Sequence, residues 1–326
     1  MTKISVIIPC YNSFKFMNKC LLSLQNQSFK DFEVIFIDDC STDGTHEKLK
    51  KYLNNTDLKW TLIRNDHNSG PGVSRNKGIE ISESRFVTFM DSDDWYENDF
   101  LEQMYITALE NNAEIVMCDY FRQYSNGKQK EMKPTIGFNK NMTKADFLAK
   151  SFDSLCCMLI EKKLFEGIKM PSQFNAEDVA IIPVLICKSK ALSFVSKPLY
   201  NYFYREGSLS TSIDKNNKIE ESIIRAYEYI CTNILNEFRE EIEFIGIKNI
   251  LYGSIVYALQ SKKSKKEINK IISDFEQNHP NWYNNKYIDD LPKAKKIFIR
   301  FVMNRNYYFL RLLSGIRTFM FKIKIA

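Results

Sequence analysis

The sequence lacks the signatures of several common protein classes. Its eight cysteines include no Cys-x-x-Cys pair, and its three histidines lie far apart along the chain. This pattern predicts neither a zinc site nor a disulfide framework, and it favours the reducing cytosol. No stretch approaches the roughly 18 consecutive apolar residues of a membrane span, and the first apolar run (residues 4–8) is too short for a signal peptide. We therefore expect a soluble or peripheral cytoplasmic protein.

The two most common nucleotide-binding loops are also missing. The sequence has no GxxxxGK[ST] phosphate loop, and no GxGxxG follows the first predicted strand, which disfavours ATP hydrolysis and NAD chemistry. The chain does have 326 residues, of which 44% are hydrophobic and 13% aromatic. That composition excludes a disordered protein, and the length allows a sizeable core and two domains.

Basic charge is concentrated at the C-terminus. Residues 262–326 carry 15 lysines and arginines against 5 acidic residues, whereas the first 261 residues carry 31 against 35. After Leu291 there are nine basic residues and no acidic one. The net charge of +6 therefore belongs to the C-terminal segment.

In the first 120 residues, short apolar runs alternate with helical spacing. This alternation predicts an α/β layer with a mostly parallel sheet. Polar loops follow three of the strands, at PCYN, DDCSTDGT and DSDD. In such sheets functional residues gather at the carboxyl ends of the strands. The predicted strands are 4–8, 33–37, 59–63, 85–90 and a strand from 114; the predicted helices are 14–27, 43–53, 73–81 and 98–109.

The residues in these loops suit a nucleoside diphosphate and its metal. Asp91 and Asp93 can both reach a hard divalent cation. Asp39 follows a buried strand, where its carboxylate can accept the imide N–H of a uracil. Residues 70–74 open a helix whose backbone N–H groups can face an anion, and Arg75 adds a fixed positive fork. One DxD alone is weak evidence, because it occurs by chance in many proteins.

Five motifs in order resemble a known family. They are ISVIIPCYN, FIDDCSTDGT, NSGPGVSRNKGI, FMDSDDW and the later pair Glu177-Asp178. This set resembles the bacterial family 2 glycosyltransferases with a GT-A fold, closely over residues 1–125 and more loosely to residue 212. The resemblance implies a GT-A catalytic domain at 1–212, with a nucleotide-sugar half (1–125) and an acceptor and base half (126–212). We expect a helical region at 213–292 to follow it.

The resemblance also implies roles for single residues. Asp178 would be the general base beside Glu177, Asp93 would bind Mn²⁺ or Mg²⁺ directly, and Asp91 would hold the ribose or help to place the metal. The remaining residues would bind the nucleotide sugar. Pro9 and Tyr11 would flank the base, Asp39 would accept the uracil N3–H, Asn68 and Arg75 would contact the nucleotide or its diphosphate, and Arg205, Ser208 and Ser210 would belong to a segment that closes over the diphosphate.

These roles imply an inverting transfer of a sugar from a UDP-sugar to a hydroxyl of a glycan acceptor, in bacterial cell-surface polysaccharide synthesis. A sugar nucleotidyltransferase is the first alternative, although its Gly-rich N-terminal loop with Arg and Lys is missing here. The second alternative is a catalytically silent protein that binds a nucleotide sugar or glycan at the membrane surface.

The C-terminal segment 293–326 has its own pattern. On a helical wheel a basic stripe (Lys293, Lys296, Arg300) lies opposite an apolar, aromatic-rich face. This pattern predicts a helix in the interface of an anionic membrane, at the inner face of the cell membrane, with a lipid-diphosphate-linked acceptor. Docking on the protein's own core is the alternative, in which Arg305 and Arg317 would fit poorly. No nucleic-acid-binding module is recognisable. For the helical region before this segment we expect a role as a scaffold or as a homo-oligomer contact.

Overall fold

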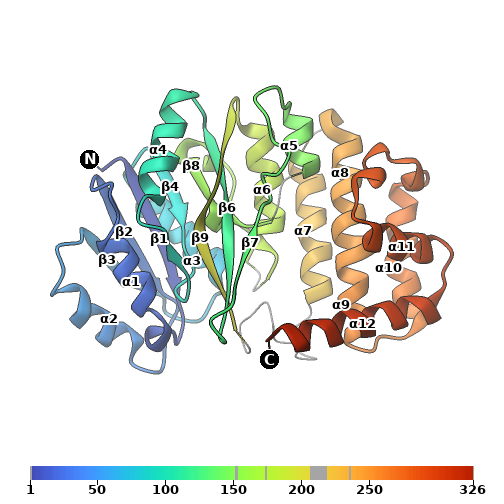
Figure 1. The fold of residues 1–326 in the computed structure, drawn as a ribbon, viewed down its shortest axis with the longest axis horizontal. Helices are drawn as coiled ribbons and strands as arrows, with labels where there is room; N and C mark the ends of the chain where they lie inside the picture. Colours follow the sequence, from blue (N-terminus) through green and yellow to red (C-terminus); the bar gives the residue numbers. More distant parts are fainter. Residues whose placement is uncertain (1, 151–152, 173–174, 206–218, 235, 326) are drawn as a thin grey trace. The chain divides into compact units, whose positions relative to one another are not determined.

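The computed structural model describes residues 2–150, 153–172, 175–205, 219–234 and 236–325, and side chains only as far as residue 316. The chain forms two compact units, coloured along the sequence in Figure 1. Unit 1 comprises residues 1–144 and 151–204, and unit 2 comprises residues 145–150 and 205–326. The domain boundary predicted at residue 212 lies outside the described residues.

Unit 1 is built on one mixed sheet with the strand order β3-β2-β1-β4-β8-β6-β9-β5, and β7 pairs with β6. Helices flank this sheet (Figure 1). The strands are β1 (Ile4–Cys10), β2 (Phe32–Asp38), β3 (Trp60–Arg64), β4 (Phe86–Phe89), β5 (Trp95–Tyr96), β6 (Ile115–Tyr124), β7 (Gln129–Met132), β8 (Met158–Glu161) and β9 (Leu192–Tyr204). The helices are α1 (Asn18–Gln25), α2 (Thr45–Leu53), α3 (Pro71–Ile81), α4 (Phe100–Glu110) and α6 (Glu177–Lys188).

The first four strands form the predicted parallel layer. β1 pairs in parallel with β2 and β4, and β2 pairs in parallel with β3. All of β1 except Pro9 is buried, as expected for a strand covered on both faces. Parallel neighbours need a crossover, and α1, α2 and α3 provide the three crossovers. The helix predicted at 14–27 is shorter than expected, because a 3-10 turn (Phe14–Phe16) precedes α1.

The rest of the sheet ties distant parts of the chain to the end of β4. β8 is antiparallel to β4 and β6, whereas β9 runs parallel to β6. The two-residue strand β5 follows the DSDD motif directly and pairs with β9 at Tyr200 and Asn201. The exit loop of β4 is therefore fixed on one side by the strand that ends unit 1.

Unit 2 is helical. Its longest continuous helical segment runs from Arg239 to Gln260 and is, by length and composition, apolar enough to cross a membrane. However, 67% of the apolar window is buried within the protein, as in the core helix of a helical bundle. The helices are α5 (Lys144–Lys150), α7 (Ile219–Asn233), α8 (Arg239–Gly246), the π-helical η5 (Ile247–Ser254), α9 (Ile255–Gln260), α10 (Lys265–Asn278), α11 (Lys293–Met303) and α12 (Tyr307–Ile325).

The C-terminal segment is two helices rather than the single helix predicted for 293–326. The break lies at Arg305, whose φ of 51° is left-handed. Its N–H donates to the carbonyl of Val302 and that of Asn306 donates to Phe301, which caps α11. Arg305 also forms an ion pair with Glu276 at 2.6 Å. Arg305 is thus accommodated by a partly exposed ion pair rather than in a core, and the side chain of Arg317 lies outside the described residues.

Candidate active site

The predicted loops meet at the carboxyl edge of the parallel strands. In the sheet register Cys10 lies opposite Asp38, and Ile7 lies opposite Phe89, so β1, β2 and β4 end close together. The loops after β1 and β2 are joined directly, because the Asn12 N–H donates to Ser41 Oγ at 2.9 Å. At this edge Tyr11 is 47% exposed and Pro9 is half-buried. An exposed ring beside a rigid proline is available to stack on a base.

Asp39 lies at the centre of this edge and is only 4% exposed. Its carboxylate accepts the backbone N–H groups of Ser69 and Gly70, the latter at 2.7 Å, and the side-chain amide of Asn65 at 2.8 Å. These N–H groups precede α3, where an anion site was predicted. In this structure the anion at that place is the protein's own Asp39, which fixes the start of α3.

This arrangement bears on the predicted contact with uracil. The three donors make four contacts, because the Ser69 N–H is shared between both oxygens, and these use about all the acceptor positions of a carboxylate. A uracil N–H at Asp39 would therefore have to displace or share one of these donors, and the role of Asp39 toward a base stays a prediction. Gly70 allows the tight approach, because its φ of 87° is left-handed and favours glycine.

Asn65 belongs to this network and was missed by the sequence analysis. It is 8% exposed, donates to Asp39 and to Ser74 Oγ, and accepts from Lys77 Nζ at 3.1 Å. The predicted ligand in this loop, Asn68, is exposed. A single asparagine after a strand carries no signal that would have identified Asn65.

Arg75 binds three carboxylates that come from two distant segments. Its guanidinium is 3% exposed and lies 2.7 Å from Asp91 Oδ1, 2.5 Å from Glu177 Oε1 and 3.5 Å from Asp178 Oδ1. The carboxylates raise the pKa of Arg75 further, against the effect of burial. We call Arg75, Asp91, Glu177 and Asp178 the Arg75 cluster. Because its Nη1 and Nη2 groups face carboxylates, Arg75 is a positioning residue here, and its contact with a diphosphate stays a prediction; its Nε is buried without a hydrogen-bond partner among the described residues.

Close backbone approach makes this cluster feasible. Gly72, in the first turn of α3, lies against the start of α6. A Cβ atom at Gly72 would lie 2.9 Å from the carbonyl oxygen of Pro171 and 3.3 Å from the Cβ of Glu177. Any other residue at this position would separate α3 from α6 and pull Arg75 away from Glu177.

Asp178 has the electrostatics of a general base. Its pKa is raised to about 7, mainly by burial; the carboxylates of Glu177 and Asp91 also raise it, whereas Arg75 and the Leu155 N–H lower it. Asp178 Oδ2 accepts that N–H at 3.1 Å. Its Oδ1 is buried and has no hydrogen-bond partner among the described residues. A carboxylate with a free lone pair and a pKa near neutrality can accept a proton at physiological pH.

Asp91 and Asp93 offer a partial ligand set for a divalent cation. The Asp91 side chain is 42% exposed, and Arg75 binds its Oδ1; Asp93 is partly exposed. Among the described residues no three His, Cys, Asp or Glu side chains gather as metal ligands. Two hard carboxylates fit Mg²⁺ or Mn²⁺, which commonly use one or two carboxylates, with substrate phosphates and water as the other ligands.

The third aspartate of the motif, Asp94, has a different role. It is 1% exposed and binds β9. It accepts the Tyr200 hydroxyl at 2.5 Å and the Phe203 N–H at 2.7 Å. The Tyr200 oxygen in turn accepts the Asp91 N–H at 3.3 Å. Asp94 and Tyr200 therefore hold the backbone of the DSDD loop in place.

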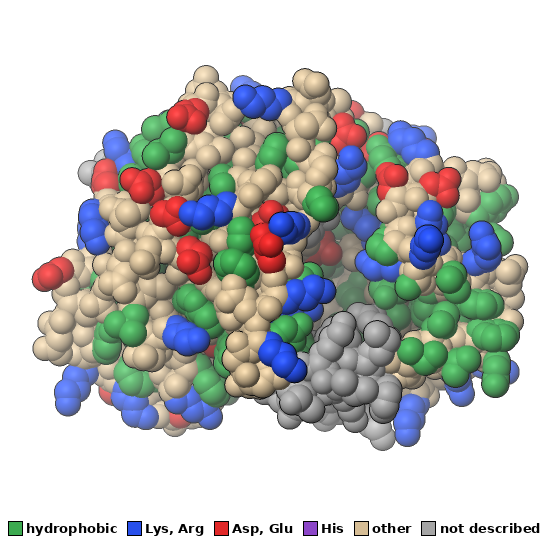
Figure 2. All heavy atoms as spheres, viewed as in Figure 1, with side chains coloured by type: hydrophobic (Ala, Val, Ile, Leu, Met, Phe, Trp, Pro, Cys, Tyr) green, Lys and Arg blue, Asp and Glu red, His purple; other side chains and the backbone are tan. Residues whose placement is uncertain are grey.

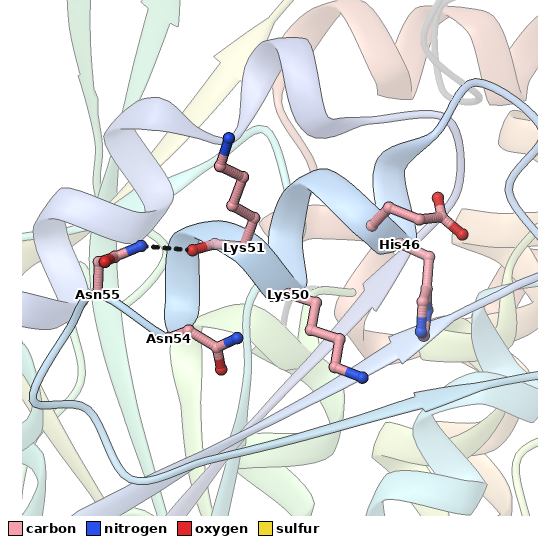
Figure 3. A pocket seen from close by; sticks show the side chains of 6 residues that line it. His46, Lys50, Lys51, Asn54 and Asn55 are labelled. Carbon is pink, nitrogen blue, oxygen red and sulfur yellow. Dashed lines mark hydrogen bonds between the residues drawn. The ribbon is translucent and has the colours of Figure 1, made fainter.

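The remaining predicted residues lie at the end of unit 1 or beyond it. Arg205 follows β9 directly and belongs to unit 2. Ser208 and Ser210 lie outside the described residues. A hollow elsewhere on the surface is lined by α2 and the residues after it, and Figure 3 shows side chains that line it. None of the predicted site residues lines it; the lining residues are His46, Glu47, Lys50, Lys51, Asn54 and Asn55.

A family comparison decides the class of this site. The model of glycosyl transferase family 2 matches residues 5–169, which is half of the chain and includes most of the predicted site. The chain belongs to glycosyltransferase family 2. It is therefore a glycosyltransferase with a GT-A fold, as the motif set predicted.

Individual relatives agree with this assignment. The glycosyltransferase GlyA of Streptococcus pneumoniae is 29% identical over 64% of this chain, which spans only 31% of GlyA. A Campylobacter jejuni β-1,3-glucosyltransferase that acts on GalNAc(5)-diNAcBac-PP-undecaprenol is 27% identical over 66% of this chain and 70% of that protein.

Solved structures share the fold. Staphylococcus aureus TarS 1–349, in complex with UDP-GlcNAc, has a TM-score of 0.73 at 22% identity, covering 96% of this chain and 91% of TarS 1–349. The mannosyltransferase PcManGT of Pyrobaculum calidifontis, in complex with GDP-Man and Mn²⁺, has a TM-score of 0.58 at 14% identity, covering 94% of this chain and 87% of PcManGT.

Proposed function

We propose that this family 2 glycosyltransferase moves a sugar from a UDP-sugar to a hydroxyl of a glycan acceptor, in the synthesis of a bacterial cell-surface polysaccharide. The Arg75 cluster carries the proposal, because it joins the exit of β4 to the start of α6 in one charged site. The UDP-GlcNAc complex of TarS supports a UDP donor. The Campylobacter relative supports an acceptor on a lipid diphosphate.

Asp178 acts as the base in a single displacement. The acceptor hydroxyl attacks the anomeric carbon while UDP leaves from the opposite face, so the configuration at that carbon inverts. Asp178 takes the hydroxyl proton, and such help is typically worth about 10²–10⁴-fold in rate. Arg75 holds Asp178 and Asp91 in their relative positions. Tyr11, together with Pro9, stacks on the uracil ring of the donor.

Asp93 and Asp91 would hold the divalent cation. When bound, Mn²⁺ or Mg²⁺ supplies Lewis-acid stabilisation of the charge that grows on the leaving diphosphate. Asp94 and Tyr200 fix the backbone of the DSDD loop and thereby position Asp91 and Asp93.

UDP release tests the proposal. Wild type, Asp178→Asn and the exposed control Asp57→Asn are incubated with a panel of UDP-sugars, with and without manganese. We expect wild type and Asp57→Asn to release UDP from at least one donor in the presence of manganese, and Asp178→Asn to be slower by about 10²-fold or more. Equal rates for Asp178→Asn and wild type, or no release from any donor by the folded wild type, would contradict the proposal.

The C-terminal helices support a peripheral position at the membrane. Figure 2 shows hydrophobic side chains gathered on the part of unit 2 where α12 lies. Tyr308 is 74% exposed and Leu312 and Ile316 are each 47% exposed, and lysines and arginines of α11 lie nearby in the sequence. An exposed apolar stripe with basic neighbours is the pattern of an interfacial helix.

Liposome co-sedimentation tests this membrane contact. Leu312→Glu with Ile316→Glu should weaken binding to phosphatidylglycerol liposomes at least tenfold, because two buried aliphatic side chains contribute about 3 kcal/mol or more. The matched control is Ile106→Glu. Ile106 lies on α4 in unit 1, and its side chain is 43% exposed. If the control and the double variant bind alike, the membrane contact lies elsewhere or does not exist.

A further inference from the structure

One face of the sheet continues outward from the candidate active site. Side chains two residues apart in a strand point to the same face, so Tyr202 and Tyr204 extend the face that begins with Tyr200. In the register of the parallel pair β6 and β9, Arg122 lies beside Tyr202 and Tyr124 lies beside Tyr204. We call Arg122, Tyr124, Tyr202 and Tyr204 the Arg122 face.

Arg122 is a half-buried cation between aromatic rings. Its guanidinium carbon lies 5.8 Å from the ring centre of Tyr202 and 5.7 Å from that of Tyr204. It forms no ion pair with any carboxylate in the described part of the chain; the Tyr124 side chain is a hydrogen-bond partner of its guanidinium, but its Nε is buried without a partner there. A buried donor without a partner is costly, and no carboxylate among the described residues neutralises the charge, so Arg122 has capacity for an anion.

A second cation lies in the same row of the sheet. β7 is antiparallel to β6, and its exposed Lys130 pairs with Arg122. Residues that pair across strands share a face. Lys130, Arg122 and Tyr202 therefore form one row across three strands, whereas the acidic residue of β7, Glu131, pairs with Phe121 on the opposite face.

The Arg122 face lies next to the proposed base and metal ligands. The Tyr200 hydroxyl contacts Asp91 and Asp94, and Tyr202 is one step of about 7 Å further along the strand. On the other side, the 3-10 turn η2 (Leu155–Cys157) packs against β6 and β9. The backbone of η2 donates to Asp178 through the Leu155 N–H.

We propose that the Arg122 face is the acceptor subsite of this enzyme and that it binds a glycan carrying a phosphate group near the hydroxyl that receives the sugar. The proposal rests on the proposed function and adds the chemical class of its acceptor. Tyrosine rings present flat surfaces to the apolar faces of a sugar, and the planar fork of Arg122 binds phosphate oxygens in pairs. Lys130 in the same row lets a phosphate contact two cations at once.

The alternative is that Arg122 has only a structural role and stabilises the packing of β6 and β9. Cation–π contacts alone are worth about 0.5–2 kcal/mol. They explain the rings, but they do not explain a row of two cations that has no acidic partner among the described residues. The two possibilities differ in what a substitution changes. If Arg122 only stabilises the pairing of β6 and β9, its substitution should lower the unfolding midpoint and the UDP affinity together. If Arg122 binds phosphate, its substitution should weaken only the binding of phosphorylated glycans.

Calorimetric titration of the full chain separates these possibilities. The probes are hexa(glycerol phosphate), hexagalacturonate and maltohexaose, which carry phosphates, carboxylates and no charge. The variants are Arg122→Gln and the matched control Arg85→Gln, whose guanidinium also lies over a ring, that of Phe86 at 4.9 Å. UDP affinity and the midpoint of thermal unfolding are measured on the same samples.

We expect wild type to bind the phosphate probe more tightly than the other two, and Arg122→Gln to lose about tenfold or more of that affinity with UDP affinity unchanged. Arg85→Gln should match wild type. Three results overturn the inference: equal affinity of wild type for all three probes, tighter binding of the galacturonate probe, or a parallel loss of UDP affinity in Arg122→Gln. Failure of every sample, wild type included, to bind UDP would instead refute the proposed function.

Discussion

The pKa of Asp178 can be shifted by a single near-isosteric substitution. Glu177 and Asp178 both contact the same Arg75 nitrogen, at 2.5 Å and 3.5 Å. The Glu177 carboxylate raises the pKa of Asp178, and it also competes for the guanidinium that lowers it. Glu177→Gln removes both effects. The two oxygens that contact this nitrogen can be at most about 6 Å apart. At that distance and an effective dielectric constant of about 20, the lost repulsion is about 3 kcal/mol, and we expect the pKa of Asp178 to fall by one to two units.

The sign of this change is testable in the pH–rate profile. As the base, Asp178 must be ionised, so kcat/KM of wild type should rise with pH through about 7. Glu177→Gln should move this acid limb to a pH lower by one to two units, measured as UDP release between pH 5 and 9. The exposed control Glu110→Gln should leave the limb in place. A limb that stays near 7 or moves upward in Glu177→Gln would refute the assignment of Asp178 as the titrating base.

Three further substitutions test single contacts. Tyr200→Phe should lower kcat/KM by up to about 10²-fold, because the DSDD loop loses its support, and circular dichroism should still show a folded protein. Asp39→Asn leaves backbone N–H groups before α3 without a full set of acceptors, so the free energy of unfolding in urea should fall by about 1–3 kcal/mol. Leu310→Ala removes a fully buried side chain of α12 and should cost about 2–5 kcal/mol in the same assay; an unchanged midpoint would mean that α12 is not docked.

The parallel half of the fold was predictable because its signals are local. In β1 and β2 nearly every residue is buried, so each strand appears in the sequence as a continuous apolar run that ends in polar residues. The second half has no such signal. β8 has only four residues, and most of the first half of β9 is partly exposed. What defines these strands is pairing with β4 and β6 across long stretches of sequence, which no local pattern encodes.

The candidate site was predictable as a set of residues but not as a set of contacts. The motifs identified Arg75, Asp91, Glu177 and Asp178, and the structure shows that one guanidinium joins them. From the sequence, Arg75 was predicted to contact the nucleotide or its diphosphate, because an arginine beside a glycine-rich turn commonly binds phosphate. Which anion an arginine faces depends on the approach of α6 to α3, and that approach is set by packing at Gly72.

The charges of the site explain why a UDP donor would need a cation there. Counted formally, the single guanidinium of Arg75 stands against the carboxylates of Asp91, Glu177 and Asp178, and Asp93 adds another at the same loop. A diphosphate brought beside this excess of negative charge meets about 4 kcal/mol of repulsion for each like pair at 4 Å and an effective dielectric constant of about 20. Arg75 cannot offset this, because its Nη1 and Nη2 groups already face carboxylates and the side chain is 3% exposed. A divalent cation held by Asp91 and Asp93 would offset this repulsion. The manganese dependence of UDP release therefore tests the electrostatics of the Arg75 cluster as well as the identity of the metal ligands.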